Sequence, residues 1–173
     1  KLAIKKPYLI KDAIYKQHLG IILLCNIQDY INFRKDNKNI NKCKFEISNN
    51  IDKIFDYYNR MGRSSITKEK IQKWLQEGHH CWLATLDNKV VGALWMFFGQ
   101  VTINQLSARV LSVNKTITFN NDTGYEGYVL IDSGYRGQGI YGSLKDYVIN
   151  HYHNDGKIRN VILITGASNG AMI

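Results

Sequence analysis

The sequence predicts a mixed α/β fold, in which helices pack on both faces of a sheet with antiparallel and parallel strands. Three observations support this prediction. Two apolar segments joined by a tight turn predict a β-hairpin near the middle of the chain. Two apolar segments later in the chain flank an amphipathic segment, which is the order of a right-handed βαβ unit. Two further amphipathic segments precede the hairpin and predict a pair of helices.

Length and composition indicate one folded domain. The chain has 173 residues, of which 45% are hydrophobic and 21% are charged, so it can bury a substantial core. It has one proline and no low-complexity linker. We expect a domain at 42–173, and an N-terminal extension at 1–41 that packs on the domain or precedes it. The longest apolar run, Ile21–Cys25, is too short to cross a membrane.

The charge and the cysteines restrict the ligands and the compartment. A formal net charge of +9 favours anionic ligands. The basic residues are scattered, so a phosphorylated cofactor explains them better than a nucleic acid does. Cys25, Cys43 and Cys81 are isolated, which argues against a disulfide scaffold or a zinc site. We therefore expect a cytoplasmic protein without a bound metal.

The N-terminal region gives the weakest patterns. Asp12–His18 is compatible with a short helix, and Gly20–Ile27 has the composition of a strand. A polar loop is expected at Lys35–Lys42. Lys44–Ile47 alternates between polar and apolar residues and predicts a short strand.

The first clear helix follows that strand. Asn49 or Asn50 is its expected N-cap, and Gly62 is its expected end. Four apolar residues share one helical face: Ile51, Ile54, Phe55 and Tyr58.

A second helix is predicted to begin near Thr67 and to end at Gly78. Ile66 and Ile71 occupy the two positions of a hydrophobic staple around the expected N-cap. Trp74 extends the apolar face of this helix, and we expect it in the core.

The hairpin consists of Cys81–Leu86, a turn at Asp87-Asn88, and a returning strand at Val90–Phe98. The connection that follows, 99–122, is long. Its segment Thr116–Phe119 alternates between polar and apolar residues, so we expect it to extend the sheet. The adjacent His79 and His80 point to opposite sides of an extended chain, which argues against a shared metal or acid–base site.

The βαβ unit comprises a strand at Tyr125–Asp132, a helix at Ile140–Tyr152 and a strand at Val161–Thr165. Ser168-Asn169 then indicates the start of another helix.

The turn between the first strand and the helix of this unit has the composition of a phosphate-binding loop. Gly137 and Gly139 allow a phosphate to approach the backbone, and the helix N-terminus adds positive potential. A nucleotide P-loop requires Gly-Lys-Ser/Thr, which does not follow either glycine. The spacing Gly137-x-Gly139-x-x-Gly142 matches a dinucleotide-binding pattern. That pattern requires an acidic residue after the next strand, where this chain has Gly166-Ala167.

A third interpretation rests on Arg136-Gly-Gln-Gly139-Ile-Tyr141, which resembles the signature of the GNAT (Gcn5-related N-acetyltransferase) superfamily. That signature reads Gln/Arg-x-x-Gly-x-Gly/Ala, and Tyr141 departs from it at the sixth position. Ala167-Ser-Asn169 and the order of the elements are also similar to this family. The resemblance covers roughly 42–173 and implies an acyl-CoA N-acyltransferase fold. The last helix and the two final strands of that fold are not visible, so we expect either that the chain is incomplete at its C-terminus or that these elements come from elsewhere.

The resemblance implies that acetyl-CoA is the co-substrate. Its pantetheine arm is expected to pair with the backbone of Val129, Leu130 and Ile131. The remaining residues expected to bind it are Arg136, Gly137, Gln138, Gly139, Ile140, Tyr141 and Asn169. The pyrophosphate is expected over the backbone N–H groups of Gly137 to Tyr141. Arg136 is expected to supply orientation, charge or a hydrogen bond that orders the loop.

The implied reaction is direct transfer of an acetyl group to a primary amine of a small molecule or peptide. The backbone N–H of Leu130 is the expected donor to the thioester oxygen. Some relatives carry a glutamate on the strand that ends at Thr165, where this chain has Ile164. Glu126 is therefore the candidate base, or a binder of the amine, and a structural role is its alternative.

The function and the assembly stay open in this interpretation. There are two alternative functions: a CoA-binding module without transfer activity, and a basic nucleic-acid-binding domain. A homodimer is one possible assembly. The residues expected to line the acceptor side, by their position alone, are Tyr57, Tyr58, Arg60 and Arg63.

Overall fold

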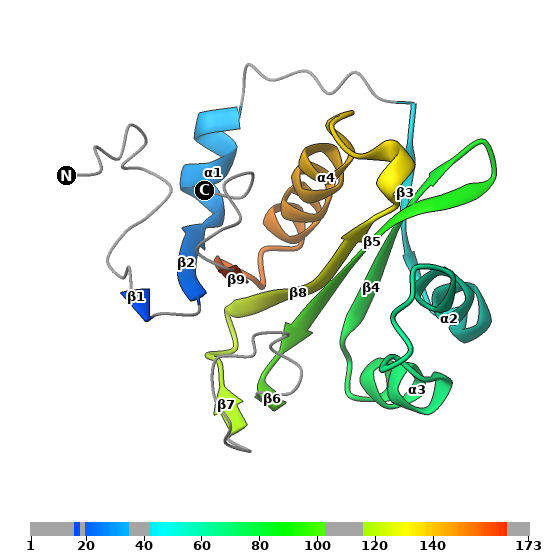
Figure 1. Ribbon diagram of the computed structural model, residues 1–173. Coiled ribbons are helices and arrows are strands. Elements are labelled where there is room, and N and C mark those ends of the chain that lie inside the picture. The colour runs from blue at the N-terminus through cyan, green and yellow to red at the C-terminus, as the bar shows by residue number, and fades with distance from the viewer. Residues whose placement is uncertain (1–15, 18–19, 35–41, 103–115, 166–173) are drawn as a thin grey trace. The chain divides into compact units, whose positions relative to one another are not determined.

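The computed structural model describes residues 16–17, 20–34, 42–102 and 116–165 (Figure 1). The chain divides into two compact units, each built from segments that are distant in sequence. Unit 1 comprises Lys1–Lys38, Phe98–Gly127 and Ile149–Ile173, and unit 2 comprises Asn39–Phe97 and Tyr128–Val148. The expected boundary between residues 41 and 42 stays a prediction.

Unit 2 contains an antiparallel arrangement of β3 (Lys44–Ser48), β4 (His80–Leu86) and β5 (Lys89–Phe98), with β4 in the middle. Asp87 and Asn88 join β4 to β5 with φ angles of 48° and 62°. Positive φ at both central residues matches the right-handed twist of a two-residue hairpin. The predicted hairpin is confirmed.

Two capped helices, α2 (Ile51–Arg60) and α3 (Lys68–Gln76), lie between β3 and β4 in sequence. The side chain of Asn50 accepts a hydrogen bond from the N–H of Lys53 at 2.9 Å, so Asn50 is the N-cap of α2. Thr67 accepts from the N–H of Lys70 at 3.3 Å and caps α3, as predicted. Both bonds satisfy amide groups that a helix start leaves without an intrahelical partner.

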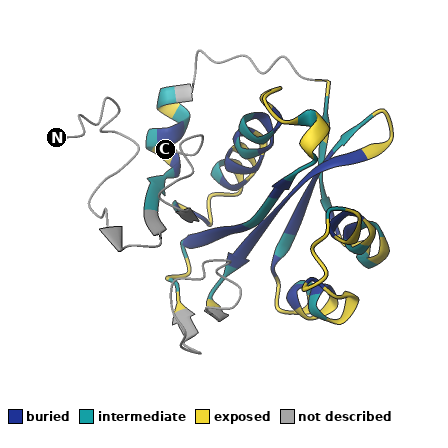
Figure 2. Cartoon of the chain, in the orientation of Figure 1, coloured by how far each residue is buried: buried dark blue, intermediate teal, exposed yellow. Residues whose placement is uncertain are grey.

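Helices cover both faces of the strands in unit 2. On one face, the Trp74 ring of α3 packs edge-on against Trp95 and Phe97 of β5, with centroid distances of 4.9 and 5.1 Å. On the other face, Tyr147 of α4 (Ile140–Asp155) contacts Phe45 and Trp82 at 5.5 and 5.8 Å. Figure 1 shows α4 and the α2–α3 pair on opposite sides of these strands, and Figure 2 shows β4 and β5 as mostly buried. The expected two-sided core is confirmed.

Unit 1 contains β1 (Lys16–Gln17), β2 (Gly20–Asn26), β9 (Asn160–Thr165) and the first half of β8 (Thr123–Ile131), in the order β1-β2-β9-β8. β2 pairs antiparallel with β9 over six residue pairs. β8 pairs parallel with β9, and α4 connects them in sequence. The predicted βαβ unit and mixed α/β fold class are therefore confirmed.

Two predictions for unit 1 were wrong, and one helix was not predicted. Lys16–Gln17 was expected in a helix but forms β1, because it pairs with Gly20 and Ile21. Helix α1 (Ile27–Arg34) was not predicted, because its apolar residues follow the helical period only weakly. Thr116–Thr118 is strand β7, but it pairs with β6 (Gln100–Thr102) in a separate two-stranded sheet. The rest of the proposed first helix, the loop at 35–41 and Ser168-Asn169 lie outside the described residues.

Candidate functional site

The second half of β8 begins with an unusual backbone conformation. Tyr128 has a φ of 49°, which is rare for a bulky residue and interrupts regular strand geometry. Its carbonyl accepts a hydrogen bond from the hydroxyl of Tyr58 at 2.6 Å. Its ring packs on Trp74 and Phe97, with centroid distances of 4.8 and 5.9 Å. The surrounding packing therefore holds this conformation in place.

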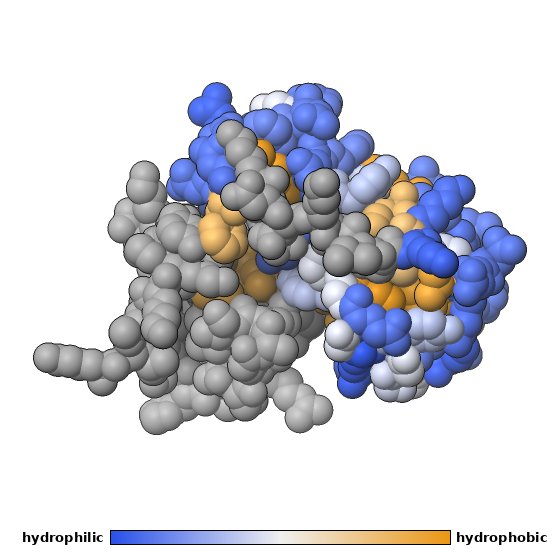
Figure 3. Space-filling view, turned by 90° about the horizontal axis from the view of Figure 1, so that it is seen from above, coloured by the Kyte–Doolittle hydropathy of each residue, from blue (hydrophilic) through white to orange (hydrophobic). Residues whose placement is uncertain are grey.

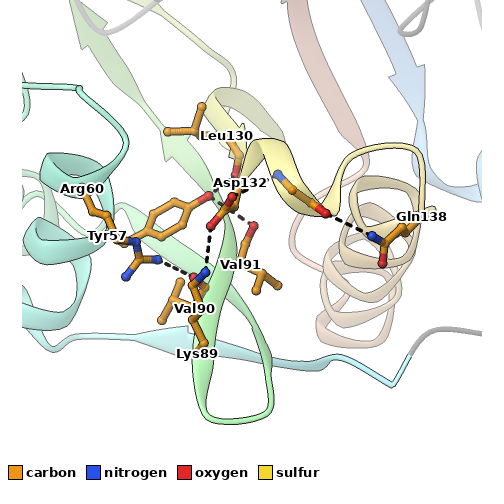
Figure 4. Close-up of polar contacts among 9 residues, drawn as sticks. Tyr57, Arg60, Lys89, Val90, Val91, Leu130, Asp132 and Gln138 are labelled. Atoms are coloured by element: carbon orange, nitrogen blue, oxygen red, sulfur yellow. Dashed lines mark hydrogen bonds and ion pairs between the residues drawn. The ribbon is translucent and has the colours of Figure 1, made fainter.

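A second tyrosine of α2 contacts the same strand. The hydroxyl of Tyr57 donates to the carbonyl of Leu130 at 2.8 Å and lies 3.4 Å from the carbonyl of Val91 (Figure 4). Burial raises the pKa of Tyr57, and it also raises the pKa of Tyr58 well above the ordinary value. Both hydroxyls therefore keep their protons at neutral pH and act as hydrogen-bond donors.

The strand ends in a capped turn. Asp132 donates its backbone N–H to the carbonyl of Val91 at 2.9 Å, and its side chain accepts from the N–H of Gly134 at 3.2 Å. This side chain caps the 3-10 helix Ser133–Tyr135. Burial acts to raise the pKa of Asp132, but the Gly134 bond and the Lys89 ammonium at 3.3 Å hold it below its ordinary value. Asp132 is therefore a charged anchor of the turn at neutral pH.

Two side chains of the glycine-rich loop hydrogen-bond to backbone carbonyls that precede the loop. The Nε of Arg136 donates to the carbonyl of Ile131 at 3.1 Å. The side-chain amide of Gln138 donates to the carbonyl of Gly134 at 3.2 Å (Figure 4). Of the three roles expected for Arg136, the structure shows the hydrogen bond that orders the loop.

Residues 137–139 of the loop are exposed. Gly137 and Gly139 have φ angles of 75° and 74°, and a Cβ built on either residue meets no atom within 4 Å. These glycines therefore serve the conformation of the backbone rather than close packing. Within the described part of the chain, no hydrogen bond uses the N–H groups of 137–140. The first amide bonded back to the loop is that of Ser143, which donates to Gly139 at 3.0 Å.

This geometry is that of an anion site. The exposed residues 137–139 directly precede α4, a helix of 16 residues whose N-terminus carries positive potential. Figure 3 shows that hydrophilic residues form much of the visible surface of the described region, with apolar areas between them. Among the described residues, no group of three or more His, Cys, Asp or Glu side chains is arranged to hold a metal ion.

Most of the residues expected to form the site lie in one continuous stretch of unit 2. Val129, Leu130 and Ile131 lead directly into the loop at 136–141. Glu126 lies on the part of β8 that belongs to unit 1, where its side chain is only 1% exposed. Asn169 lies outside the described residues.

The structure corrects the position expected for one pair of side chains. Tyr57 and Tyr58 were expected to line an acceptor surface, but each is only 1% exposed and both hydroxyls contact backbone carbonyls. Arg60 is exposed, and it donates to the carbonyl of Val90 at 2.7 Å. The Asp132 cap was not predicted, although Asp132-Ser-Gly134 has the pattern of an Asx turn.

Comparisons with known proteins identify the family of this chain. The model of the acetyltransferase (GNAT) family matches residues 49–173. No curated protein matches the chain.

Several solved structures share the fold. An aminoglycoside acetyltransferase from an uncultured soil metagenomic sample, in complex with sisomicin, is 18% identical with a TM-score of 0.52; the match covers 75% of this chain and 82% of that one. Glucosamine-6-phosphate N-acetyltransferase from Arabidopsis thaliana is 15% identical with a TM-score of 0.50, over 76% and 88% of the two chains.

A functionally unknown conserved protein from Staphylococcus epidermidis has a TM-score of 0.58 at 12% identity. The match covers 89% of this chain but only 53% of that protein, so the chain spans about half of its length. At these identities the likeness shows the fold alone.

Proposed function

Because the chain belongs to the acetyltransferase (GNAT) family, we propose that it transfers an acetyl group from acetyl-CoA to a primary amine. The observation that carries the proposal is the loop at 136–140. Its ordered turn and its unused backbone N–H groups fit the pyrophosphate of CoA. Bound there, acetyl-CoA would supply the acetyl thioester.

The loop suits a diphosphate because its donors are held in place before binding. The Arg136 and Gln138 side chains bond to the carbonyls of Ile131 and Gly134, which precede the loop, and so hold the loop in one conformation before an anion binds. Lys89, Arg60 and Arg136 add positive charge in the same unit. The proposal places the pyrophosphate over the amides of Gly137, Gln138, Gly139, Ile140 and Tyr141.

The backbone of Val129–Ile131 is the proposed partner of the pantetheine arm. An amide-containing chain can add to a strand through main-chain hydrogen bonds, without requiring particular side chains. In an extended strand the N–H and C=O of one residue point to the same side, and successive residues alternate. Asp132 faces β5, as its backbone bond to Val91 indicates, and the alternation places the N–H and C=O of Leu130, two residues earlier, on the same side of β8.

The alternation refines the expected role of Leu130. The N–H groups of Val129 and Ile131 therefore point away from β5. The N–H of Leu130 points to the same side of the strand as its own carbonyl, which accepts from Tyr57. We therefore propose that the backbone N–H of Val129 or Ile131, the two neighbours of Leu130, donates to the thioester oxygen. Negative charge develops on this oxygen during the reaction.

Proton transfer requires a base for the acceptor amine, which attacks only in its neutral form. Glu126 is the proposed base or amine binder. Its side chain is almost completely buried, so it would act on a bound amine or through a bound water rather than from open solvent.

A ligand-binding assay tests the proposal first. Acetyl-CoA and CoA are expected to raise the thermal unfolding temperature in a concentration-dependent way, because a ligand of the folded state stabilises it. NAD and a short DNA duplex serve as controls for the dinucleotide and nucleic-acid alternatives. A response to either control without a response to CoA would reject the proposal.

Turnover then separates an enzyme from a binding module. Release of free thiol from acetyl-CoA is measured across a panel of amines that includes an aminoglycoside, glucosamine 6-phosphate and a peptide with a free N-terminus. Amine-dependent thiol release is expected for at least one class. Binding without release across the panel would favour the CoA-binding module.

A further inference from the structure

We propose that Tyr57 and Tyr58 are positioning residues for acetyl transfer, acting through the backbone of β8. This inference rests on the proposed function, because it concerns the strand expected to hold the acetyl thioester. Their hydroxyls fix the carbonyls of Leu130 and Tyr128, which lie two residues apart on β8. The N–H groups of Val129 and Ile131 are thereby directed to the opposite side of the strand.

The geometry of the two bonds supports a shared task. Tyr57 and Tyr58 are adjacent on α2, and both are 1% exposed. Their bonds measure 2.8 Å to Leu130 and 2.6 Å to Tyr128. Adjacent helical residues point in different directions, yet both hydroxyls reach carbonyls of β8, one of them that of Tyr128 with its φ of 49°. The strand conformation and the tyrosine pair therefore depend on each other.

A side-chain donor on a strand carbonyl has a specific consequence. Carbonyls of an inner strand normally accept from the N–H groups of the neighbouring strand. Here Tyr57 serves the carbonyl of Leu130 and lies near that of Val91, while Asp132 already donates to Val91. The single hydroxyl proton of Tyr57 therefore goes to Leu130. It fixes the peptide plane between Leu130 and Ile131, and with it the direction of the Ile131 N–H.

The helix holds both strands from one side. Arg60, one turn beyond Tyr57 on α2, donates to the carbonyl of Val90 at 2.7 Å. Its guanidinium lies 5.5 Å from the centre of the Tyr57 ring. Figure 4 shows Tyr57 and Arg60 reaching from α2 to the backbone of β5 and β8. Three side chains of one helix thus donate to carbonyls of β5 and β8.

Proton transfer by these hydroxyls is not part of the proposal. Burial raises the pKa of both tyrosines, so neither ionises in the working range of an amine acetyltransferase. They act on the reaction only through the peptide groups that they orient. A positional effect of this kind should be independent of pH between about 6 and 9.

Conservative variants test the proposal without requiring the natural acceptor. Tyr57→Phe and Tyr58→Phe each remove one hydroxyl and keep the ring. Tyr30→Phe, in α1, is the matched control, because Tyr30 is also buried and lies outside the proposed site. The probe is acetyl-CoA labelled with ¹³C at the acetyl carbonyl, whose resonance moves downfield when an N–H donates to its oxygen.

The proposal predicts a downfield shift on binding to the wild type and to Tyr30→Phe. At least one tyrosine variant is expected to lose half or more of that shift, while its Kd for acetyl-CoA changes less than threefold. With any amine that supports turnover, kcat should fall about tenfold at unchanged acceptor KM, because a transition-state contact weakens. The size of this fall should be the same from pH 6 to pH 9.

The outcomes separate the two proposals. Normal wild-type binding and shift, with the same shift in both folded tyrosine variants, would overturn the inference and leave the proposed function intact. Absence of acetyl-CoA binding by the wild type would reject both. If one variant does not fold, the other decides, since each removes a different bond to β8.

Discussion

At the scale of single residues, the site is built from side chains that hold the backbone. Arg136, Gln138 and Asp132 all hydrogen-bond to main-chain groups of the loop or strand end. Such bonds fix where amides point, which is what anion binding and oxyanion stabilisation require. The chemistry that we propose therefore depends on orientation more than on reactive side chains.

Glu126 is the one carboxylate with a proposed part in proton transfer. Glu126→Gln is expected to lower kcat by at least tenfold, with little change in acetyl-CoA affinity, because it removes a proton acceptor and keeps the side-chain shape. The measurement is thiol release at saturating acetyl-CoA, together with the Kd from calorimetry. Wild-type kcat in the variant would assign Glu126 to structure instead.

His79 gives a prediction about stability and pH. Its ring is 2% exposed, and burial lowers its pKa; Glu77, 3.5 Å away, partly offsets this effect and His80 adds to it. A lowered pKa means that the unfolded chain binds the proton more readily. The contribution of neutral His79 to the free energy of unfolding is therefore complete above a pH of about 6.5, and it is lost as the pH falls below that value.

The test compares the wild type with His79→Gln, which does not titrate. The free energy of unfolding, measured by urea denaturation from pH 8 to pH 5, should fall more steeply for the wild type below pH of about 6.5. The extra slope can reach about 1.4 kcal/mol per pH unit. Parallel curves for the two proteins would contradict the assignment.

At the scale of elements, the loop at 136–140 is defined by two glycines with positive φ. Gly139→Ala is expected to weaken acetyl-CoA binding tenfold or more, because alanine disfavours the conformation that presents the amides. Gly156→Ala is the matched control, since Gly156 has a φ of 71° and also meets no atom within 4 Å.

Both substitutions should cost roughly 1–2 kcal/mol of stability, from the left-handed backbone alone. Only Gly139→Ala should also lose affinity, as measured by isothermal titration calorimetry at a temperature where both variants are folded. Equal affinities in the two variants would remove the loop from the proposed site.

Elements with strong local signals were predictable from the sequence. The caps Asn50 and Thr67, the Asp87-Asn88 turn and the glycine-rich loop all use residues whose side chain or φ preference dictates the local structure. The weak N-terminal pattern was not sufficient, because β1 exists only through its pairing with β2. The positions of Tyr57 and Tyr58 were predicted wrongly. Periodicity indicates which face of a helix is buried, but it does not show that the two hydroxyls contact carbonyls of β8.

At the scale of the whole molecule, the fold joins segments that are far apart in sequence. In unit 1, β9 lies between β2 and β8, so a segment near the start of the chain covers one edge of a buried strand. Ile27 adds a backbone bond from its N–H to the carbonyl of Arg159 at 2.8 Å. Residues 21–27 are therefore bonded into unit 1.

Removal of residues 1–26 is expected to destabilise the protein and promote aggregation. It would expose the backbone edge of β9, whose Val161 and Leu163 are 1% and 6% exposed. The measurement is the thermal unfolding temperature and the soluble fraction, compared with the full chain. Unchanged values for both would show that the β2–β9 pairing contributes little.

The whole chain also carries a net charge of +9, which favours an anionic co-substrate without selecting one. No helix among the described residues has the length and apolar character to cross a membrane. In our proposal, the local arrangement of amides at the start of α4 provides the preference for CoA that the net charge does not.

Amide NMR during titration with CoA tests this central claim most directly. The ¹⁵N–¹H resonances of Gly137, Gln138, Gly139 and Ile140 are expected to move most and to saturate together with the binding curve. Because glycine amides resonate in a separate region, two of these four signals are readily followed. Saturable binding that leaves these four resonances unchanged would contradict the account.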